Sequence, residues 1–168
     1  MIIMNEINII YDVKKEAYTG VDISSILGMS KDELIENGDR LKNGSDEQIK
    51  AGLNLWMMAL TKDQTDAAQI GKIAKYQNKI GDEDGALKTY ETGIKAIEQK
   101  GNGDKAALGN LYLGKAQLEI YSRGNKDYEQ AQKDIETSAE LTDEPVDQSL
   151  MITIEEGIAR QKRRKNKA

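Results

Sequence analysis

The sequence predicts a mainly helical protein of one domain, preceded by an N-terminal segment that forms either a β-hairpin or one extended arm. Three observations carry this prediction. Helix start and stop signals alternate from Ser30 onward, apolar residues recur between them at helical spacing, and Pro145 is the only proline. The signals define seven helical segments joined by short loops, an arrangement that favours antiparallel neighbours.

The segment before Ser30 follows a different pattern. Ile7, Ile9, Tyr11 and Val13 occupy alternate positions, which is the period of two that a strand requires. A second β-leaning run covers residues 17–23. No Asn-Gly or Asp-Gly pair joins the two runs, so the hairpin and the single extended arm both stay open. We assign residues 1–29 to this extended or β arm.

Capping residues mark where the helices begin. Ser30 with Glu33 and Ser45 with Gln48 form capping boxes, so the first helix runs from Ser30 to about Asn43 and the second from Ser45 to about Leu60. The remaining helices are predicted to run from Thr65 to Ile80, from Asp82 to Gly101, from Asp104 to Arg123, from Asp127 to Leu141 and from Pro145 onward.

Apolar residues place these helices in a packed stack. The fourth helix has one apolar face, made by Ala86, Tyr90, Gly93, Ile94 and Ile97. The last helix carries a single apolar stripe, made by Val146, Leu150, Ile154 and Ile158. One such stripe is typical of a capping helix at the end of a stack. Trp56 lies mid-helix in the most apolar run of the chain, which we interpret as core rather than as a contact surface.

The middle of the chain resembles the tetratricopeptide (TPR) repeat family. Residues 67–100 match one unit, with Ala74 at the small position of the first helix, Gly81-Asp82 in the turn and Ala86-x3-Tyr90-x2-Gly93 in the second helix. A second unit covers residues 104–142 and a degenerate third covers 30–61. Ala131 follows Ala86 by 45 positions, so the repeats are longer than the family's ~34 residues or only TPR-like. An unrelated seven-helix bundle is the alternative.

The resemblance implies a short TPR-like α-solenoid over residues 30–157, followed by a basic tail at 158–168. It also implies that the first helices of the hairpins line a groove that binds a peptide or a partner protein. The residues expected there are Lys72, Lys75, Asn78, Lys79, Asn110 and Lys115. The alternative is that these are ordinary solvated side chains.

Charge is divided unevenly along the chain. The net charge is −5, yet residues 158–168 hold six basic residues and no acidic one. Such a tail suits a phosphate or an acidic partner, through Arg160, Lys162, Arg163, Arg164 and Lys165. A solvated helix end is the alternative interpretation. The acidic body disfavours nucleic acid, so we expect it to bind only through the tail.

Composition argues against catalysis. The chain has no cysteine and no histidine, so the commonest general base, metal ligand and thiol nucleophile are missing. A P-loop-like run at 109–116 lacks the final Ser or Thr, and a calcium-loop-like run places Ile80 at the first ligand position. We therefore expect no cofactor, no metal site and no enzymatic activity.

The N-terminal residues lack the pattern of a secretory signal, and no apolar run approaches the ~20 residues of a membrane span. We therefore expect a cytoplasmic protein without membrane contact. The function that the sequence favours is a protein–protein interaction module, an adaptor or chaperone-like protein. Two alternatives stay open: a nucleic-acid-associated or regulatory factor that uses the tail, and a structural subunit of a homo-oligomer.

Overall fold

The computed structural model describes residues 26, 28–101, 103–124 and 126–166. Residues 31–168 form one compact unit, which is described here by itself. The arm predicted for residues 1–29 falls almost wholly outside the described residues, so both forms of it stay predictions.

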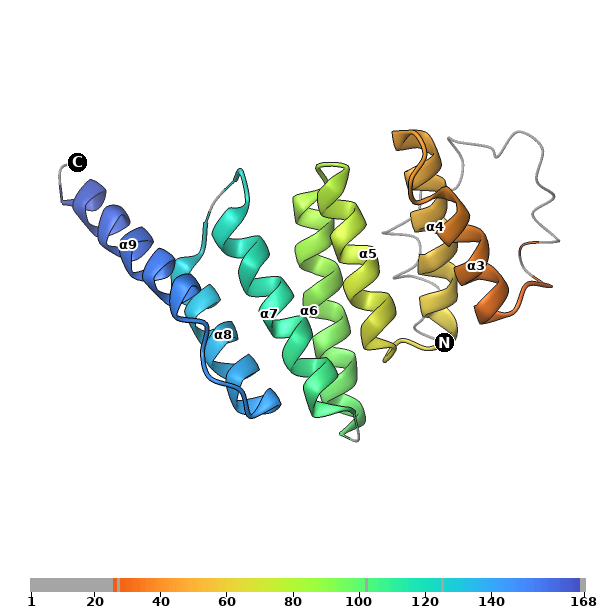
Figure 1. Ribbon diagram of the computed structural model, residues 1–168. Coiled ribbons are helices and arrows are strands. Elements are labelled where there is room, and N and C mark those ends of the chain that lie inside the picture. The colour runs from red at the N-terminus through yellow and green to blue at the C-terminus, as the bar shows by residue number, and fades with distance from the viewer. Residues whose placement is uncertain (1–25, 27, 102, 125, 167–168) are drawn as a thin grey trace. The chain divides into compact units, whose positions relative to one another are not determined.

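The unit is built from seven α-helices that follow one another along the described chain (Figure 1). Their bounds are α3 Lys31–Leu41, α4 Asp46–Lys62, α5 Ala67–Lys79, α6 Glu83–Lys100, α7 Lys105–Tyr121, α8 Tyr128–Thr142 and α9 Gln148–Lys165. No strand occurs among the described residues. The prediction of a mainly helical fold is therefore confirmed for this part of the chain.

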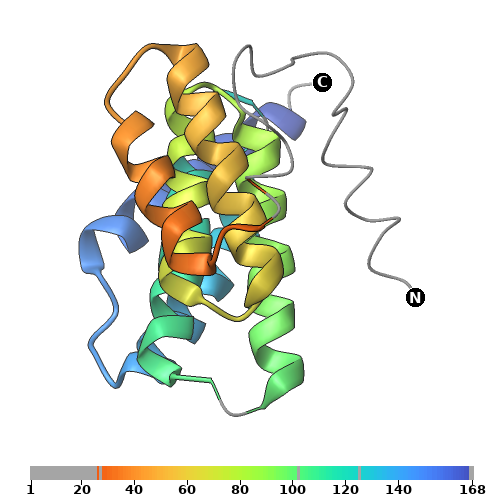
Figure 2. The same cartoon turned by 90° about the vertical axis from the view of Figure 1, so that its right-hand side faces the viewer.

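Helices that are neighbours in the sequence pack against each other. The most extensive contacts join α3 to α4, α5 to α6 and α7 to α8, and further contacts link each pair to the next. α9 packs on α8, and α5 also contacts α7. Seen from the α3–α4 end, α5 and α6 lie behind that pair (Figure 2). The short connections make consecutive helices antiparallel.

Polar side chains cap the helix starts, largely where the sequence predicts them. Ser45 and Gln48 form the expected capping box, because the Ser45 backbone N–H donates to Gln48 Oε1 at 2.9 Å and the Gln48 N–H donates to Ser45 Oγ. Asp82, Asp104 and Asp127 accept hydrogen bonds from the first-turn N–H groups of α6, α7 and α8. These caps satisfy donors that a helix start otherwise leaves without partners.

Two predicted starts are wrong by one or a few residues. α5 is capped by Asp66, whose Oδ1 accepts from the Gln69 N–H at 3.0 Å, while the Thr65 hydroxyl donates to Asp63 instead. α9 does not open at Pro145. It begins after Asp147, whose Oδ1 accepts from the backbone N–H of Ser149 at 2.9 Å. In both places a carboxylate near the expected residue is the side chain that caps the helix.

Close helix crossings account for several glycines. A Cβ on Gly93 of α6 would lie 2.6 Å from Ile70 of α5, and one on Gly52 of α4 would lie 2.9 Å from the Gly38 carbonyl oxygen of α3. Gly109 of α7 approaches the Ser138 carbonyl of α8 in the same way, at 3.1 Å. This close approach to α8 explains why a glycine stands at position 109. Gly109 is also the first residue of the P-loop-like run, whose glycine is therefore accounted for by helix packing.

Three apolar clusters form the core between these helices. The first joins α5, α6 and α7, the second joins α7, α8 and α9, and the third joins α4 and α5. Trp56 belongs to the third cluster and is 0 % exposed, which confirms its interpretation as core. The Leu150 and Ile154 stripe of α9 packs into the second cluster, so α9 covers the open side of α8.

Candidate functional site

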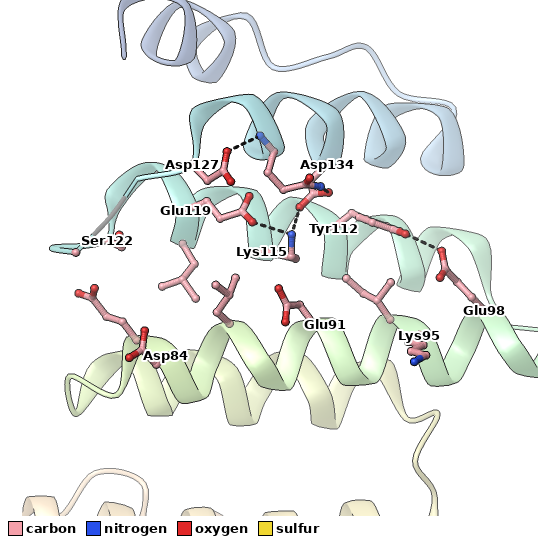
Figure 3. A pocket seen from close by; sticks show the side chains of 16 residues that line it. Asp84, Glu91, Lys95, Glu98, Tyr112, Lys115, Glu119, Ser122, Asp127 and Asp134 are labelled. Atoms are coloured by element: carbon pink, nitrogen blue, oxygen red, sulfur yellow. Dashed lines mark hydrogen bonds and ion pairs between the residues drawn. The ribbon is translucent and has the colours of Figure 1, made fainter. Parts of the chain in front are cut away.

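An open groove of about 830 Å³ lies between α6, α7 and α8 (Figure 3). Its lining is strongly acidic, with seven carboxylates and two lysines. The carboxylates are Glu83, Asp84, Glu91, Glu98, Glu119, Asp127 and Asp134, and the lysines are Lys95 and Lys115. Three apolar side chains, Leu87, Ile94 and Leu118, lie among them. We call this feature the acidic groove.

The α6 wall of the acidic groove follows from sequence spacing. Asp84, Glu91 and Glu98 are seven residues apart, so they fall on one face of the helix at intervals of about 10.5 Å. Leu87 and Ile94 fall between them on the same side. This wall therefore alternates carboxylates with apolar side chains along the length of the helix.

The floor of the acidic groove holds a buried charge cluster. Lys115 Nζ of α7 donates to Glu119 Oε1, one turn along the same helix, at 2.7 Å, and to Asp134 Oδ2 of α8 at 2.6 Å. Figure 3 shows the three side chains converging. Gln130 Nε2 donates to the other Asp134 oxygen at 2.9 Å. Glu119 is 6 % exposed, and its Oε2 is buried with no hydrogen-bond partner in the described part of the chain.

The cluster contains two carboxylates and one ammonium group, and this imbalance appears in the pKa values. Burial raises the pKa of Glu119 to about 7, against the attraction of Lys115 and with added repulsion from Asp134 and Asp127. For Lys115, burial alone would lower the pKa, but the hydrogen bonds to Asp134 and Glu119 outweigh it and raise the pKa. Glu119 is thus poised between its neutral and ionised forms near neutral pH.

We expect Glu119 to make the protein less stable as the pH rises from about 4.5 to about 7. In this window the folded protein keeps a proton that the unfolded chain has released, so rising pH favours the unfolded chain. The effect should be on the order of 1–3 kcal/mol and should be absent from Glu119→Gln. Urea unfolding at a series of pH values measures it as the difference between the two profiles.

The matched control is Glu91→Gln, which removes an exposed carboxylate from the same groove. Its pH profile should parallel that of the unmodified protein. Parallel profiles for Glu119→Gln and the unmodified protein would contradict the assigned pKa.

The remaining carboxylates divide into engaged and unengaged groups. Glu98 accepts from the Tyr112 hydroxyl at 2.6 Å, and Glu83 accepts from the Arg123 backbone N–H at 2.9 Å. Burial, followed by this hydrogen bond to Glu98, raises the pKa of Tyr112. By contrast, Asp84 and Glu91 are exposed. Their side chains make no hydrogen bond or ion pair within the part of the chain that the structure describes. The acidic groove therefore carries uncompensated negative charge toward solvent.

The lysines predicted on α5 lie apart from the acidic groove. Lys72 pairs with Asp39 at 3.0 Å, and its Nζ lies 5.0 Å from the centre of the Trp56 ring system. Lys79 Nζ lies 5.2 Å from the centre of the Tyr76 ring. Lys75 is exposed. Two of these three side chains are therefore held against the protein's own surface.

The other predicted residues are dispersed. Asn78 and Lys79 line a second cavity of about 410 Å³, together with Tyr121 and Arg123. Asn110 is exposed on α7. Lys115 is buried, and its charge is already met by two carboxylates of this chain. The structure thus brings Asn78 and Lys79 together but places Lys115 in a different groove.

The basic tail is largely helical. α9 continues through Lys165, so the basic residues predicted for the tail lie in the last turns of this helix. Lys162, Arg163 and Arg164 are exposed, and Arg160 lies 3.8 Å from Glu156. These cations remain available to an anionic partner.

The described residues show neither a metal site nor a membrane-spanning helix. No group of three or more acidic, histidine or cysteine side chains among them is arranged to hold a metal ion. None of the described helices combines the length and the apolar character needed to cross a membrane.

Comparison with known proteins adds no relative. No protein-family model, curated protein or solved structure matches this chain.

Proposed function

We propose that this protein is a protein-interaction module, an adaptor or chaperone-like protein, that binds a positively charged segment of a partner in the acidic groove. The observation that carries the proposal is the charge of the lining, seven carboxylates against two lysines. Lys115 is already paired, and the side chains of Asp84 and Glu91 face solvent without a partner among the described residues. Complementary charge steers association and selects among partners.

The mixed chemistry of the α6 wall supports a peptide rather than a lone small ion. Leu87 and Ile94 alternate with carboxylates, so a segment carrying both apolar and basic side chains would find a partner surface for each. A cavity of about 830 Å³ falls within the range of ligand sites. This proposal changes the expected chemistry of the partner from acidic, as the α5 lysines imply, to basic.

A TPR-like architecture is part of the proposal. It is supported by the pairing of consecutive helices and by the burial of the residues that carry the resemblance. Ala74 and Ala86 are fully buried, and Tyr90 packs in the cluster that joins α5, α6 and α7. Gly93 allows α6 to approach Ile70 of α5. Small residues at such crossings and an aromatic residue between hairpins are what the repeat pattern requires.

Charge reversal in the acidic groove tests the proposal. The double variant Asp84→Lys/Glu91→Lys should bind a fluorescent, capped peptide with lysine at every third position at least about tenfold more weakly than the unmodified protein does. Both side chains are exposed and form no pair within the described part of the chain, so the fold should persist, which circular dichroism checks. Fluorescence polarisation gives the affinities.

The matched control reverses the charges of the α5 surface with Lys75→Glu/Lys79→Glu. This variant should keep its affinity for the lysine peptide within about twofold. The opposite pattern, with a glutamate-rich peptide bound and lost only in the α5 variant, would overturn the acidic groove. It would then favour the surface expected from the family resemblance.

The exposed cations at the end of α9 support nucleic-acid contact as a second candidate function. Lys162, Arg163 and Arg164 are solvent-exposed, and no acidic residue follows Glu156. Retention of RNA or DNA that weakens steeply with salt, and that is lost on deleting residues 160–168, would favour this candidate.

A further inference from the structure

We infer that the floor of the acidic groove contains a subsite for one primary ammonium group, the end of a lysine side chain of the partner, at the Glu119 carboxylate. The inference rests on the proposed function for the class of partner, and it adds which side chain is recognised and by which atom. It is carried by the hydrogen bonds of the buried cluster.

An account of the carboxylate oxygens leaves one of them without a donor. Asp134 Oδ2 accepts from Lys115 Nζ, and Asp134 Oδ1 accepts from Gln130 Nε2. Glu119 Oε1 accepts from Lys115 Nζ. Glu119 Oε2 has no hydrogen-bond partner among the residues that the structure describes, although it is buried and the residue is only 6 % exposed. A buried polar atom without a partner is costly, so a donor supplied by a ligand would be favoured there.

The charge of the cluster points to a cationic donor. Glu119 and Asp134 share one ammonium group, and the Asp127 carboxylate adds further negative charge nearby. A second ammonium group would balance the buried pair of carboxylates. Burial raises the pKa of Glu119 in the free protein, and repulsion from Asp134 and Asp127 adds to the rise; the second ammonium group would relieve that repulsion.

The geometry favours an ammonium over a guanidinium group. Arginine gains its advantage by donating two parallel hydrogen bonds to both oxygens of one carboxylate. At Glu119 one oxygen already accepts from Lys115, so a two-point contact would have to share that oxygen, whereas a single-point contact at Oε2 would not. An ammonium is a compact point charge on an unbranched stem. Leu87, Ile94 and Leu118 line the same groove and would contact the methylenes of that stem.

Entry requires a local movement, because Glu119 Oε2 is covered in the unbound protein. Glu119 nevertheless lines the open groove, so the atom to be reached lies at the groove floor. A slender lysine stem requires less displacement than a planar guanidinium group. The subsite is thus expected to discriminate by shape as well as by hydrogen bonding.

The test uses a capped peptide of about nine residues with lysine at every third position, titrated by calorimetry into the full chain. Each lysine is replaced in turn by arginine and by norleucine, which keeps the stem and removes the charge. At one position, both replacements should weaken binding about tenfold. At the other two positions arginine should replace lysine with little change. Glu119→Gln should abolish the difference at the sensitive position.

Asp84→Asn is the matched control, since it removes a carboxylate from the rim and leaves the floor intact. It should weaken all the peptides alike and keep the preference for lysine at the sensitive position. Arginine tolerated at every position, or a lysine preference that survives in Glu119→Gln, would overturn the subsite and leave the proposed function standing. Failure of every lysine peptide to bind the unmodified protein would overturn both.

Discussion

Replacing Lys115 by methionine is expected to lower the free energy of unfolding by about 3–5 kcal/mol near pH 8. Lys115 is the only cation that pairs with the buried Glu119 and Asp134 carboxylates in the described chain, at 2.7 and 2.6 Å. Its removal leaves two like charges buried without compensation. The loss should be smaller near pH 5, where Glu119 is protonated because its pKa is about 7. Urea unfolding followed by circular dichroism measures both values.

Two further variants establish that the effect arises from the buried cluster. Lys95→Met removes an exposed lysine from the same groove and should change stability by no more than about 0.5 kcal/mol. Adding Glu119→Gln and Asp134→Asn to Lys115→Met removes the uncompensated charges and should restore much of the loss. A Lys115→Met variant as stable as the unmodified protein would show that the cluster is not closed in solution.

Replacing Trp56 by alanine is expected to cost about 3–5 kcal/mol of stability. The side chain is 0 % exposed, and it packs with Ile49, Leu53 and Ile73 between α4 and α5. Its ring meets the Tyr76 ring edge-on, with the centroids 5.0 Å apart. Its Nε1 donates to the Ile35 carbonyl oxygen of α3 at 3.3 Å, so one residue ties three helices together.

Circular dichroism is the appropriate probe for this variant, because Trp56 is the only tryptophan and the tryptophan fluorescence would be lost with it. Tyr121→Ala is the control, since this aromatic side chain is 62 % exposed and should contribute little. Trp56→Phe should fall between the two, because it keeps an aromatic ring and loses volume and the indole donor. Equal stability of Trp56→Ala and Tyr121→Ala would contradict the assigned core.

Helix positions could be predicted well because their determinants are local. The Ser45 capping box and the left-handed Gly101, with φ of 70°, fix their helix ends through contacts within a few residues. The start of α5 was harder, because Thr65 and Asp66 are adjacent and both residue types cap helices. Asp66 rather than Thr65 caps the helix, because the Thr65 hydroxyl donates to Asp63 instead. That contact cannot be read from capping preferences alone.

The acidic groove could be predicted only in part. The spacing of Asp84, Glu91 and Glu98 along one helix is visible in the sequence. The charge cluster at the floor cannot be predicted from spacing within one helix, because it depends on which face of α7 packs against α8. The family resemblance implies that Lys115 lies on a partner-binding surface. In the structure Lys115 pairs with Asp134, which is 19 residues away on α8. Asp134 is buried on that helix beside Ala131, Ile135 and Ser138.

The pairing of each helix with its chain neighbours also bears on how the unit assembles. Almost every extensive contact joins segments that are consecutive in the sequence, so the loops that must close are short. Such low contact order lets structure form with little loss of chain entropy at each step, which is typical of fast-folding helical proteins. It also permits the end helices to unravel while the centre stays ordered. The acidic groove lies on α6, α7 and α8, inward of α9, so we expect α9 to fray before the helices that line the groove.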